Sequence, residues 1–310
     1  MMRALLMLAM TGMLAAGQQR QQRPTFTSNT DVVVLDVAVR VPNLTAADFL
    51  VTDNGVRQTV HLMDASTLPI DLTVVLDISG SMATLIGPMT KYAEDVVALM
   101  QAGDRVRLIT VGNNVRQVFG FSAGAELPHI DELTTGESTS LLDGLAAALM
   151  RARPPDRRQL VVAVTDGQDT MSTVSQQAFE ALAARSDAVL FILRPEYTGM
   201  DRVPPRLPGN TRKRWSAPFA GFIEPEPGVT TGEGRLGYVA RGTGGEFTRM
   251  FATEGGLPRA LADVLAEYRA NYVLRYQLSG VTREGWHDIA VALPMHPGTE
   301  IRARRGYFAR

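Results

Sequence analysis

The sequence predicts an α/β fold with a doubly wound, mostly parallel sheet. Two apolar runs, residues 72–76 and 160–164, have the length and β-branched content of buried strands. Between residues 69 and 270, segments with helical spacing alternate with strand-like segments, as a doubly wound sheet requires. Hydrophobic residues make up 45% of the 310-residue chain, which supports a substantial core.

The remaining elements of this central region follow in chain order. Further strands are expected at 105–111, 115–121, 188–193 and 246–250. Helices are expected at 85–100, 140–151, 174–184, 235–240 and 257–268.

Both ends of the chain are predicted to be β-rich. A strand is expected at 32–39, and a hairpin is expected from 48–52 to 57–63 across an Asp-Asn-Gly turn. The C-terminal region adds expected strands at 272–278, 286–293 and 300–308. Because a few short strands cannot stand alone, residues 26–68 and 271–310 are predicted to form one small β-sandwich that encloses the domain 69–270.

Three segments fall outside these elements. Residues 1–17 resemble a secretory signal peptide, with Arg3 before an apolar run too short to span a membrane, and residues 18–25 form a polar tail. A Pro- and Gly-rich insertion at 195–234 is expected to emerge beside the carboxyl ends of the strands. We therefore expect a secreted or periplasmic protein with no membrane span after signal cleavage.

Composition excludes several classes of function. The formal net charge of -1 and the sequence pI of about 6.5 argue against binding of nucleic acid or of an anionic membrane. Cysteine is absent, which excludes disulfides, thiolate metal sites and thiol nucleophiles.

Oxygen-bearing side chains follow the first buried strand in the pattern Asp77-x-Ser79-x-Ser81. In a straight strand Asp77 and Ser81 would lie about 13 Å apart. One cation with ligands at about 2.1 Å could not contact both, so the chain must turn after Asp77, and Gly80 permits this. A carboxylate and two hydroxyls suit Mg²⁺, whereas the simpler interpretation is a Ser/Gly turn.

A second carboxylate, Asp166, follows the strand at 160–164. Because the carboxyl ends of parallel strands share one edge of a sheet, Asp77 and Asp166 are expected to meet there. Two neighbouring buried carboxylates repel each other unless a cation or a proton lies between them.

These two motifs together resemble the von Willebrand factor type A domain over roughly residues 71–269. That family has a metal-ion-dependent adhesion site with Asp-x-Ser-x-Ser, a Thr from a second loop and an Asp from a third. By this resemblance Asp77, Ser79, Ser81 and Asp166 are metal ligands. The spacing to the following helix favours Thr139 as the Thr ligand, with Thr135 and Ser138 as alternatives.

The resemblance also implies a function. It implies a module that uses Mg²⁺, with Mn²⁺ or Ca²⁺ as alternatives, to bind a protein or peptide through an Asp or Glu of the partner, and it implies no enzymatic activity. The stretches 44–49 and 302–307 are similar to those of a secreted bacterial subgroup of this family.

Four alternative interpretations remain. A Gly-x-Ser-x-Gly motif at 120–124 would make Ser122, Asp166 and His287 a hydrolase triad. A Gly-x-Gly-x-x-Gly motif at 232–237 would mark a dinucleotide site, but no strand precedes it. The chain could also be a Mg²⁺-dependent hydrolase or phosphatase-like enzyme, or a structural envelope protein without metal.

Overall fold

The computed structural model describes most of the chain from Val32 to Ala309. The described residues are 32–83, 96, 98–123, 135–151, 154, 156–196, 232–251 and 255–309. The predicted signal peptide and polar tail, and most of the predicted helix 85–100 and insertion 195–234, lie outside them.

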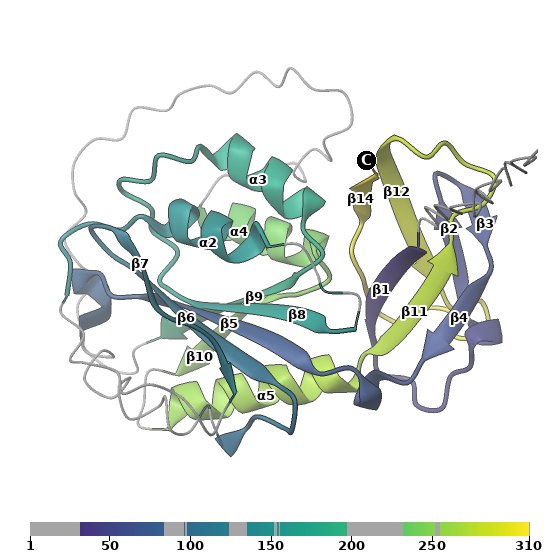
Figure 1. Ribbon diagram of the computed structural model, residues 1–310, viewed down its shortest axis with the longest axis horizontal. Coiled ribbons are helices and arrows are strands. Elements are labelled where there is room, and N and C mark those ends of the chain that lie inside the picture. The colour runs from purple at the N-terminus through teal and green to yellow at the C-terminus, as the bar shows by residue number, and fades with distance from the viewer. Residues whose placement is uncertain are drawn as a thin grey trace, which may run out of the picture. The chain divides into compact units, whose positions relative to one another are not determined.

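A six-stranded sheet forms the centre of the fold, in the order β10-β9-β8-β5-β6-β7 (Figure 1). All neighbouring strands are parallel except β6 and β7. This arrangement confirms the predicted fold class. The strands are β5 (Ile70–Asp77), β6 (Arg105–Val111), β7 (Val115–Ala123), β8 (Arg158–Val164), β9 (Val189–Glu196) and β10 (Phe247–Phe251).

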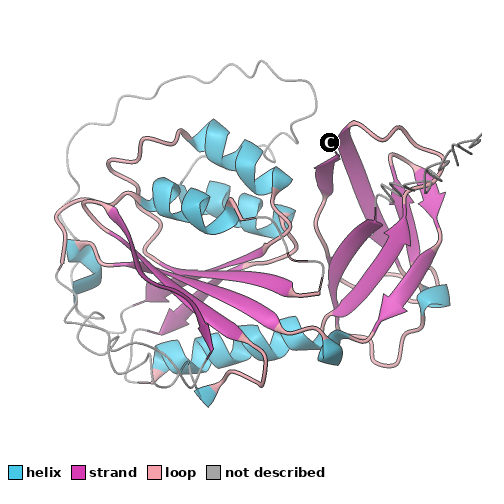
Figure 2. Ribbon diagram, in the orientation of Figure 1, coloured by secondary structure: helices cyan, strands magenta, loops and turns pink. Residues whose placement is uncertain are grey.

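Helices cover both faces of this sheet. Figures 1 and 2 show α2 (Leu141–Leu149), α3 (Gln176–Arg185) and α4 (Gly232–Gly242) on one face and α5 (Gly256–Ala270) on the other. Alternate residues of each strand join separate cores, so that Leu72 packs on the α5 side and Val75 on the α2 side. Every residue of β5 and β8 is buried, which explains why their sequences are almost continuously apolar.

The two ends of the chain combine in two antiparallel sheets, which confirms the predicted association of the flanks. Their orders are β13-β1-β11-β4 and β14-β12-β2-β3, and they share one hydrophobic core. The N-terminal strands are β1 (Val32–Val39), β2 (Leu50–Asp53), β3 (Val56–Gln58) and β4 (Val60–Met63). The C-terminal strands are β11 (Tyr272–Gln277), β12 (Gly285–Ala292), β13 (Ile301–Arg302) and β14 (Gly306–Ala309).

Two predicted strands each divide between the two sheets. The segment 57–63 was expected to be one strand, but β3 ends at Gln58 and β4 pairs with β11 in the other sheet. At this corner the buried Gln58 side chain donates to Ser279 O and accepts from Ser279 N. These two bonds replace the backbone hydrogen bonds that a continuing strand would make. The segment 300–308 divides in the same way, because Arg305 N donates to Gly242 O at 3.0 Å instead of continuing the strand.

Arginines join the flanking sheets to the central sheet and its helices. The Arg158 side chain, at the start of β8, is fully buried and forms a 2.7 Å ion pair with Asp36 of β1. Near the C-terminus, Arg302 pairs with both Glu246 and Glu267, and Arg304 pairs with Asp187 at 2.5 Å. Arg302 and Arg304, both in the stretch 302–307, therefore attach the flanking sheets to the central sheet and its helices.

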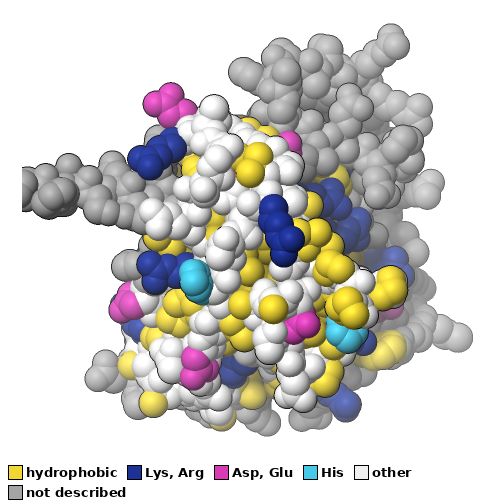
Figure 3. Space-filling view, turned by 90° about the vertical axis from the view of Figure 1, so that its right-hand side faces the viewer, with side chains coloured by type: hydrophobic (Ala, Val, Ile, Leu, Met, Phe, Trp, Pro, Cys, Tyr) yellow, Lys and Arg dark blue, Asp and Glu magenta, His cyan; other side chains and the backbone are white. Residues whose placement is uncertain are grey.

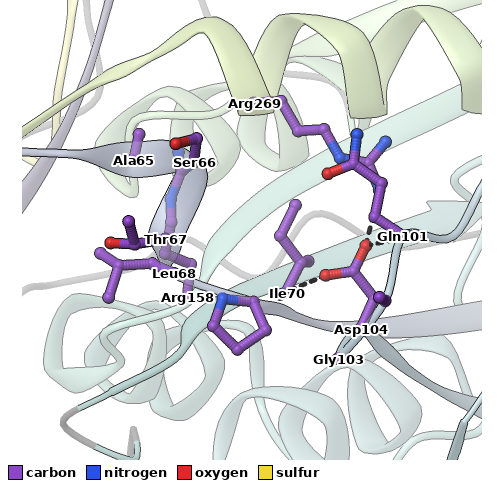
Figure 4. A pocket seen from close by; sticks show the side chains of 12 residues that line it. Ala65, Ser66, Thr67, Leu68, Ile70, Gln101, Gly103, Asp104, Arg158 and Arg269 are labelled. Atoms are coloured by element: carbon purple, nitrogen blue, oxygen red, sulfur yellow. Dashed lines mark hydrogen bonds and ion pairs between the residues drawn. The ribbon is translucent and has the colours of Figure 1, made fainter.

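A hollow of about 400 Å³ lies at the amino end of β5, at the opposite end of the strand from Asp77 (Figure 4). Its charged groups are already paired. Asp104 accepts hydrogen bonds from Ile70 N and Gln101 N and forms a 2.7 Å ion pair with Arg269. The hollow is therefore separate from the candidate site at the carboxyl ends of the strands.

The surface of the flanking sheets carries scattered hydrophobic side chains. Figure 3, which views this side, shows them among polar and charged groups. The exposed large ones in the flanks are Val56, Leu62, Met295 and Phe308. Scattered exposure of this kind is ordinary for a protein surface. None of the helices in the described part of the chain has the length and apolar character needed to cross a membrane.

Arg158→Met should lower the free energy of unfolding by about 3–5 kcal/mol, because it leaves the buried Asp36 carboxylate without its cation. The matched control is Arg249→Met. Arg249 pairs with Glu196 at the surface, where both side chains are exposed, so its loss should cost at most about 1 kcal/mol. Urea unfolding at neutral pH measures both changes, and equal losses in the two variants would contradict the assigned role of Arg158.

Candidate metal-binding site at the carboxyl ends of the strands

The Asp77 loop begins where β5 ends. Asp77 is the last residue of the strand and has no exposed surface. Ser79 N donates to Asp77 Oδ1 at 2.9 Å, and the chain then enters a 3-10 turn at Gly80–Met82. The predicted change of direction after Asp77 is therefore confirmed.

Hydroxyl groups connect the two predicted acidic positions. Ser79 Oγ and Ser81 Oγ lie 3.1 Å apart, and Ser81 Oγ donates to Asp166 Oδ2 at 2.6 Å. Because Ser79 also bonds Asp77 through its backbone, these four residues form one continuous polar cluster. The structure thus brings the Asp-x-Ser-x-Ser motif and the second carboxylate together, as strand-end convergence predicts.

The loop that contains Thr139 lies directly beside the Asp77 loop. Gly136 forms a parallel bridge with Ser79, and its N–H donates to Ile78 O at 2.9 Å. A Cβ at Gly136 would lie 2.9 Å from Asn113 N, so only glycine permits this close approach.

Burial distinguishes the three candidate second-loop residues. Thr139 is 4% exposed, whereas Thr135 is exposed and Ser138 is half-buried. The backbone of Thr139 is also fixed, since Thr170 Oγ1 accepts from its N–H at 2.8 Å and Thr170 N donates to its carbonyl at 3.0 Å. Thr139 is therefore the most buried of the three, and its role as a metal ligand stays a prediction.

Thr165 is a site residue that the sequence prediction missed. Its hydroxyl donates to Asp77 Oδ2 at 2.7 Å and accepts from Gly167 N at 3.0 Å, and it is fully buried. Thr165 therefore orients the second oxygen of Asp77. The sequence did indicate this role, because Thr165 is a hydroxyl residue at the end of an otherwise apolar strand and directly precedes Asp166.

Asp169 has a structural role in this region. Its Oδ1 accepts hydrogen bonds from Leu142 N at 3.2 Å and from the Ser172 hydroxyl, so it caps the first turn of α2. Asp143 of the same turn accepts in return from Thr173 N and Val174 N. These reciprocal bonds fix the loop after β8 against the helix that follows Thr139.

The electrostatics of Asp77 are unusual for a structural carboxylate. Burial raises its pKa above the ordinary value of 3.8, and the charge of Asp166 raises it further, while hydrogen bonds from Ser79 and Thr165 oppose the shift. Among the described residues, no cation affects this pKa and no ion pair involves Asp77 or Asp166. A buried carboxylate normally has a cationic partner.

The donor set also fits a hard divalent cation. The described residues contain no cluster of three or more His, Asp or Glu side chains that could hold a metal. A cation here would instead use hydroxyl oxygens together with the two carboxylates, and oxygen ligands are those that Mg²⁺ prefers.

The hydrolase triad suggested by the Gly-x-Ser-x-Gly motif is not assembled. Ser122 lies on β7, which runs antiparallel to β6, so it is at the amino ends of the other strands, and its hydroxyl donates to Gly120 O at 3.3 Å. Asp166 follows the carboxyl end of β8, and His287 is buried in β12 against Asp53. The Gly-x-Gly-x-x-Gly motif forms the start of α4 and is not a loop after a strand.

Residues 72–168 match the family model of the von Willebrand factor type A domain. The match contains every predicted metal ligand and spans less than half of the chain. It confirms the resemblance at the level of the domain, while the secreted bacterial subgroup stays a prediction. No curated protein sequence matches the chain significantly.

Solved structures with similarity to the chain include other proteins with type A domains. Proximal thread matrix protein 1 from the mussel byssus, with a zinc-occupied MIDAS motif, is 15% identical over 71% of this chain and 50% of that chain, with a TM-score of 0.47. The ArnB paralog VWA2 from Sulfolobus acidocaldarius is 11% identical over 88% of this chain and 75% of that chain, with a TM-score of 0.44. An aerotolerance-related membrane protein from Bacteroides fragilis is 15% identical over 64% of this chain and 99% of that chain, with a TM-score of 0.41. The chain spans 38% to 50% of the length of the three byssus protein structures.

Asp77→Asn should change how stability depends on pH when no metal is present. The folded protein holds the Asp77 proton more tightly than the unfolded chain does, so this group lowers the free energy of unfolding as the pH rises above 3.8. Asn does not titrate, and the variant should therefore gain stability relative to the parent as the pH rises above 3.8. Urea unfolding in EDTA at a series of pH values above 3.8 measures the difference.

The control for this experiment is Asp263→Asn, which alters an exposed carboxylate on α5. An equal pH-dependent gain in this control would show that the gain does not come from the buried site. A pH-independent difference for Asp77→Asn would contradict the raised pKa of Asp77.

Proposed function

We propose that the type A domain of this chain binds a divalent cation and uses it to bind a partner protein through an acidic residue of that partner. Asp77, Ser79, Ser81, Thr139 and Asp166 would hold the cation, with Mg²⁺ the best fit and Mn²⁺ or Ca²⁺ as alternatives. Type A domains mediate protein binding, and many bind a divalent cation at this position.

The observation that carries this proposal is the buried Asp77 carboxylate, beside which the described part of the chain places no cationic side chain. Its two oxygens are held by Ser79 N and by the Thr165 hydroxyl, which position the carboxylate. Ser79 and Ser81 place hydroxyl oxygens between it and Asp166. A single divalent cation at this cluster would remove the repulsion between the two carboxylates.

The hydroxyl-rich donor set supports binding of an external carboxylate. A bound Mg²⁺ would carry two positive charges. Asp77 would bind it directly and Asp166 through water, so the direct protein ligands would balance only one of those charges. Hydroxyl ligands add no negative charge, so the site would keep affinity for a Glu or Asp from outside. The role of this chain is to hold those oxygens at an edge of the sheet where a partner can reach them.

An enzymatic function has less support. Water activation at a metal needs a general base near the reacting atom. Among the described residues no His or Lys forms a hydrogen bond or ion pair with Asp77, Ser79, Ser81 or Asp166. We therefore propose a binding module and not an enzyme.

Isothermal titration of Mg²⁺ and Mn²⁺ into the full chain should show one saturable site that Asp77→Ala abolishes. Thr165→Val should weaken the metal affinity about 10–100-fold by releasing one oxygen of Asp77, while Thr165→Ser keeps the hydroxyl and the affinity. Thr139→Ala should reduce binding, and Thr135→Ala should not. Asp263→Ala is the control for charge, and equal binding by Asp77→Ala and the parent would exclude this site.

Peptides selected from a random displayed library on the Mg²⁺-loaded chain, and eluted with EDTA, should contain a Glu or Asp. Replacement of that residue by Gln or Asn should abolish peptide binding, because only the charged oxygen can approach the cation favourably. Fluorescence anisotropy with each peptide pair measures this, with Asp77→Ala as the metal-free control. Selected peptides without an acid, or binding that persists in EDTA, would contradict the proposed mode of recognition.

A further inference from the structure

A cluster of arginines lies at the amino ends of β5 and β6, at the opposite end of the sheet from the candidate metal site. It surrounds the side chains of Asp71 and Phe121. The four members of this arginine cluster are Arg105, Arg107, Arg151 and Arg157.

Two of these arginines suffice to satisfy Asp71. The Asp71 side chain is fully buried, and Arg105 binds it with both Nε and Nη2, at 2.9 and 2.6 Å. Arg157 Nε adds a contact to Oδ1 at 2.5 Å. Arg151 reaches Asp71 only at 3.9 Å, so neutralising this carboxylate does not account for its position.

Phe121 holds three of the guanidinium groups together. The guanidinium carbons of Arg105, Arg107 and Arg151 lie 5.4, 5.0 and 4.3 Å from its ring centroid. These are cation–π distances. Arg107 is held further by Thr73 Oγ1 at 3.2 Å and by the carbonyl of Ala148, at the end of α2, at 3.0 Å.

The cluster has an excess of positive charge. Within the described parts of the chain, Asp71 and the exposed Asp156 are the carboxylates that interact with these four arginines. The guanidinium carbons of Arg107 and Arg151 lie within about 10 Å of each other, which is about one Debye length at 0.1 M salt. Burial lowers the pKa of Arg107, and the charge of Arg151 lowers it further, as expected for like charges held together.

We propose that the arginine cluster binds a phosphoryl group of a soluble or lipid-borne ligand. The described members of the cluster carry more positive charge than the carboxylates that contact them, which favours an anionic ligand such as a phosphate. The planar guanidinium fork suits phosphate oxygens, and Arg151, with 38% of its side chain exposed, offers it to solvent. Arg105 and Arg107 add fixed positive charge on the same aromatic ring.

An extended polyanion fits the observations less well than a single phosphoryl group does. Binding along nucleic acid requires basic groups spread over a long surface, whereas this charge is concentrated around one phenylalanine and the chain is formally -1 overall. The proposal does not depend on the cation site, because the two lie at opposite ends of β5.

The test is isothermal titration of pyrophosphate into the full chain, in metal-depleted buffer of low ionic strength. The parent should show saturable binding, and Arg151→Gln should weaken it at least tenfold. Arg107→Gln should also weaken it. Circular dichroism melts check that both variants keep the fold.

The matched control is Arg185→Gln. Arg185 also stacks on an aromatic ring, that of Phe308 at 4.5 Å, but it lies on α3 away from the cluster. Its loss should leave pyrophosphate binding unchanged. Absence of binding by the parent, or equal weakening by Arg151→Gln and Arg185→Gln, would overturn the proposal.

A second arm of the test identifies the source of the phosphate. The parent and Arg151→Gln are sedimented with vesicles of phosphatidic acid, whose headgroup is a phosphomonoester, and phosphatidylcholine in equal parts. Co-sedimentation of the parent that Arg151→Gln abolishes would identify a lipid headgroup. Pyrophosphate binding without co-sedimentation would identify a soluble phosphate-bearing ligand.

Discussion

The burial of two carboxylates on one strand is the constraint on which the rest of the structure depends. Strand β5 has no exposed residue, yet it carries Asp71 near its amino end and Asp77 at its carboxyl end. An ionised carboxylate in such surroundings requires a compensating partner. Arginines supply the positive charge at Asp71, whereas at Asp77 the described residues supply hydrogen bonds and no cation. The two ends of the strand are therefore electrostatic opposites.

The loops after β5 and β8, and the loop before α2, are organised around the Asp77 end. Backbone bonds from Gly136 to Ile78 and from Thr170 to Thr139 join these loops to one another. Asp143 and Asp169 then fasten the loop after β8 to α2. These hydrogen bonds fix the backbone of the three loops, and so keep Asp77 and Asp166 near each other in spite of their mutual repulsion.

The sequence allowed the fold class and most of the candidate site to be predicted, because both follow from local patterns. Buried strands are continuous apolar runs, and acids directly after them must meet at one edge, which located Asp77 and Asp166. Thr165 was missed because its role depends on which way its hydroxyl points across to β5. The breaks at Thr59 and Ala303, where one predicted strand divides into two, were missed. The alternation of buried and exposed side chains continues through such a corner when the chain passes from one sheet to the other. The arginine cluster could not be foreseen, since its members come from distant segments and only the sheet register brings them together.

The position of β5 gives the two proposed sites a fixed relationship. Hydrogen bonds to β6 and β8 hold the strand along its whole length, so its ends cannot move independently. Asp77 follows Asp71 by six positions, a span of about 20 Å in an extended strand. Ligands at the two ends would be held at a constant separation by a fully buried strand. A rigid connection of this kind suits a module that joins two partners better than one that transmits a conformational change between them, because transmission requires an element with two stable arrangements.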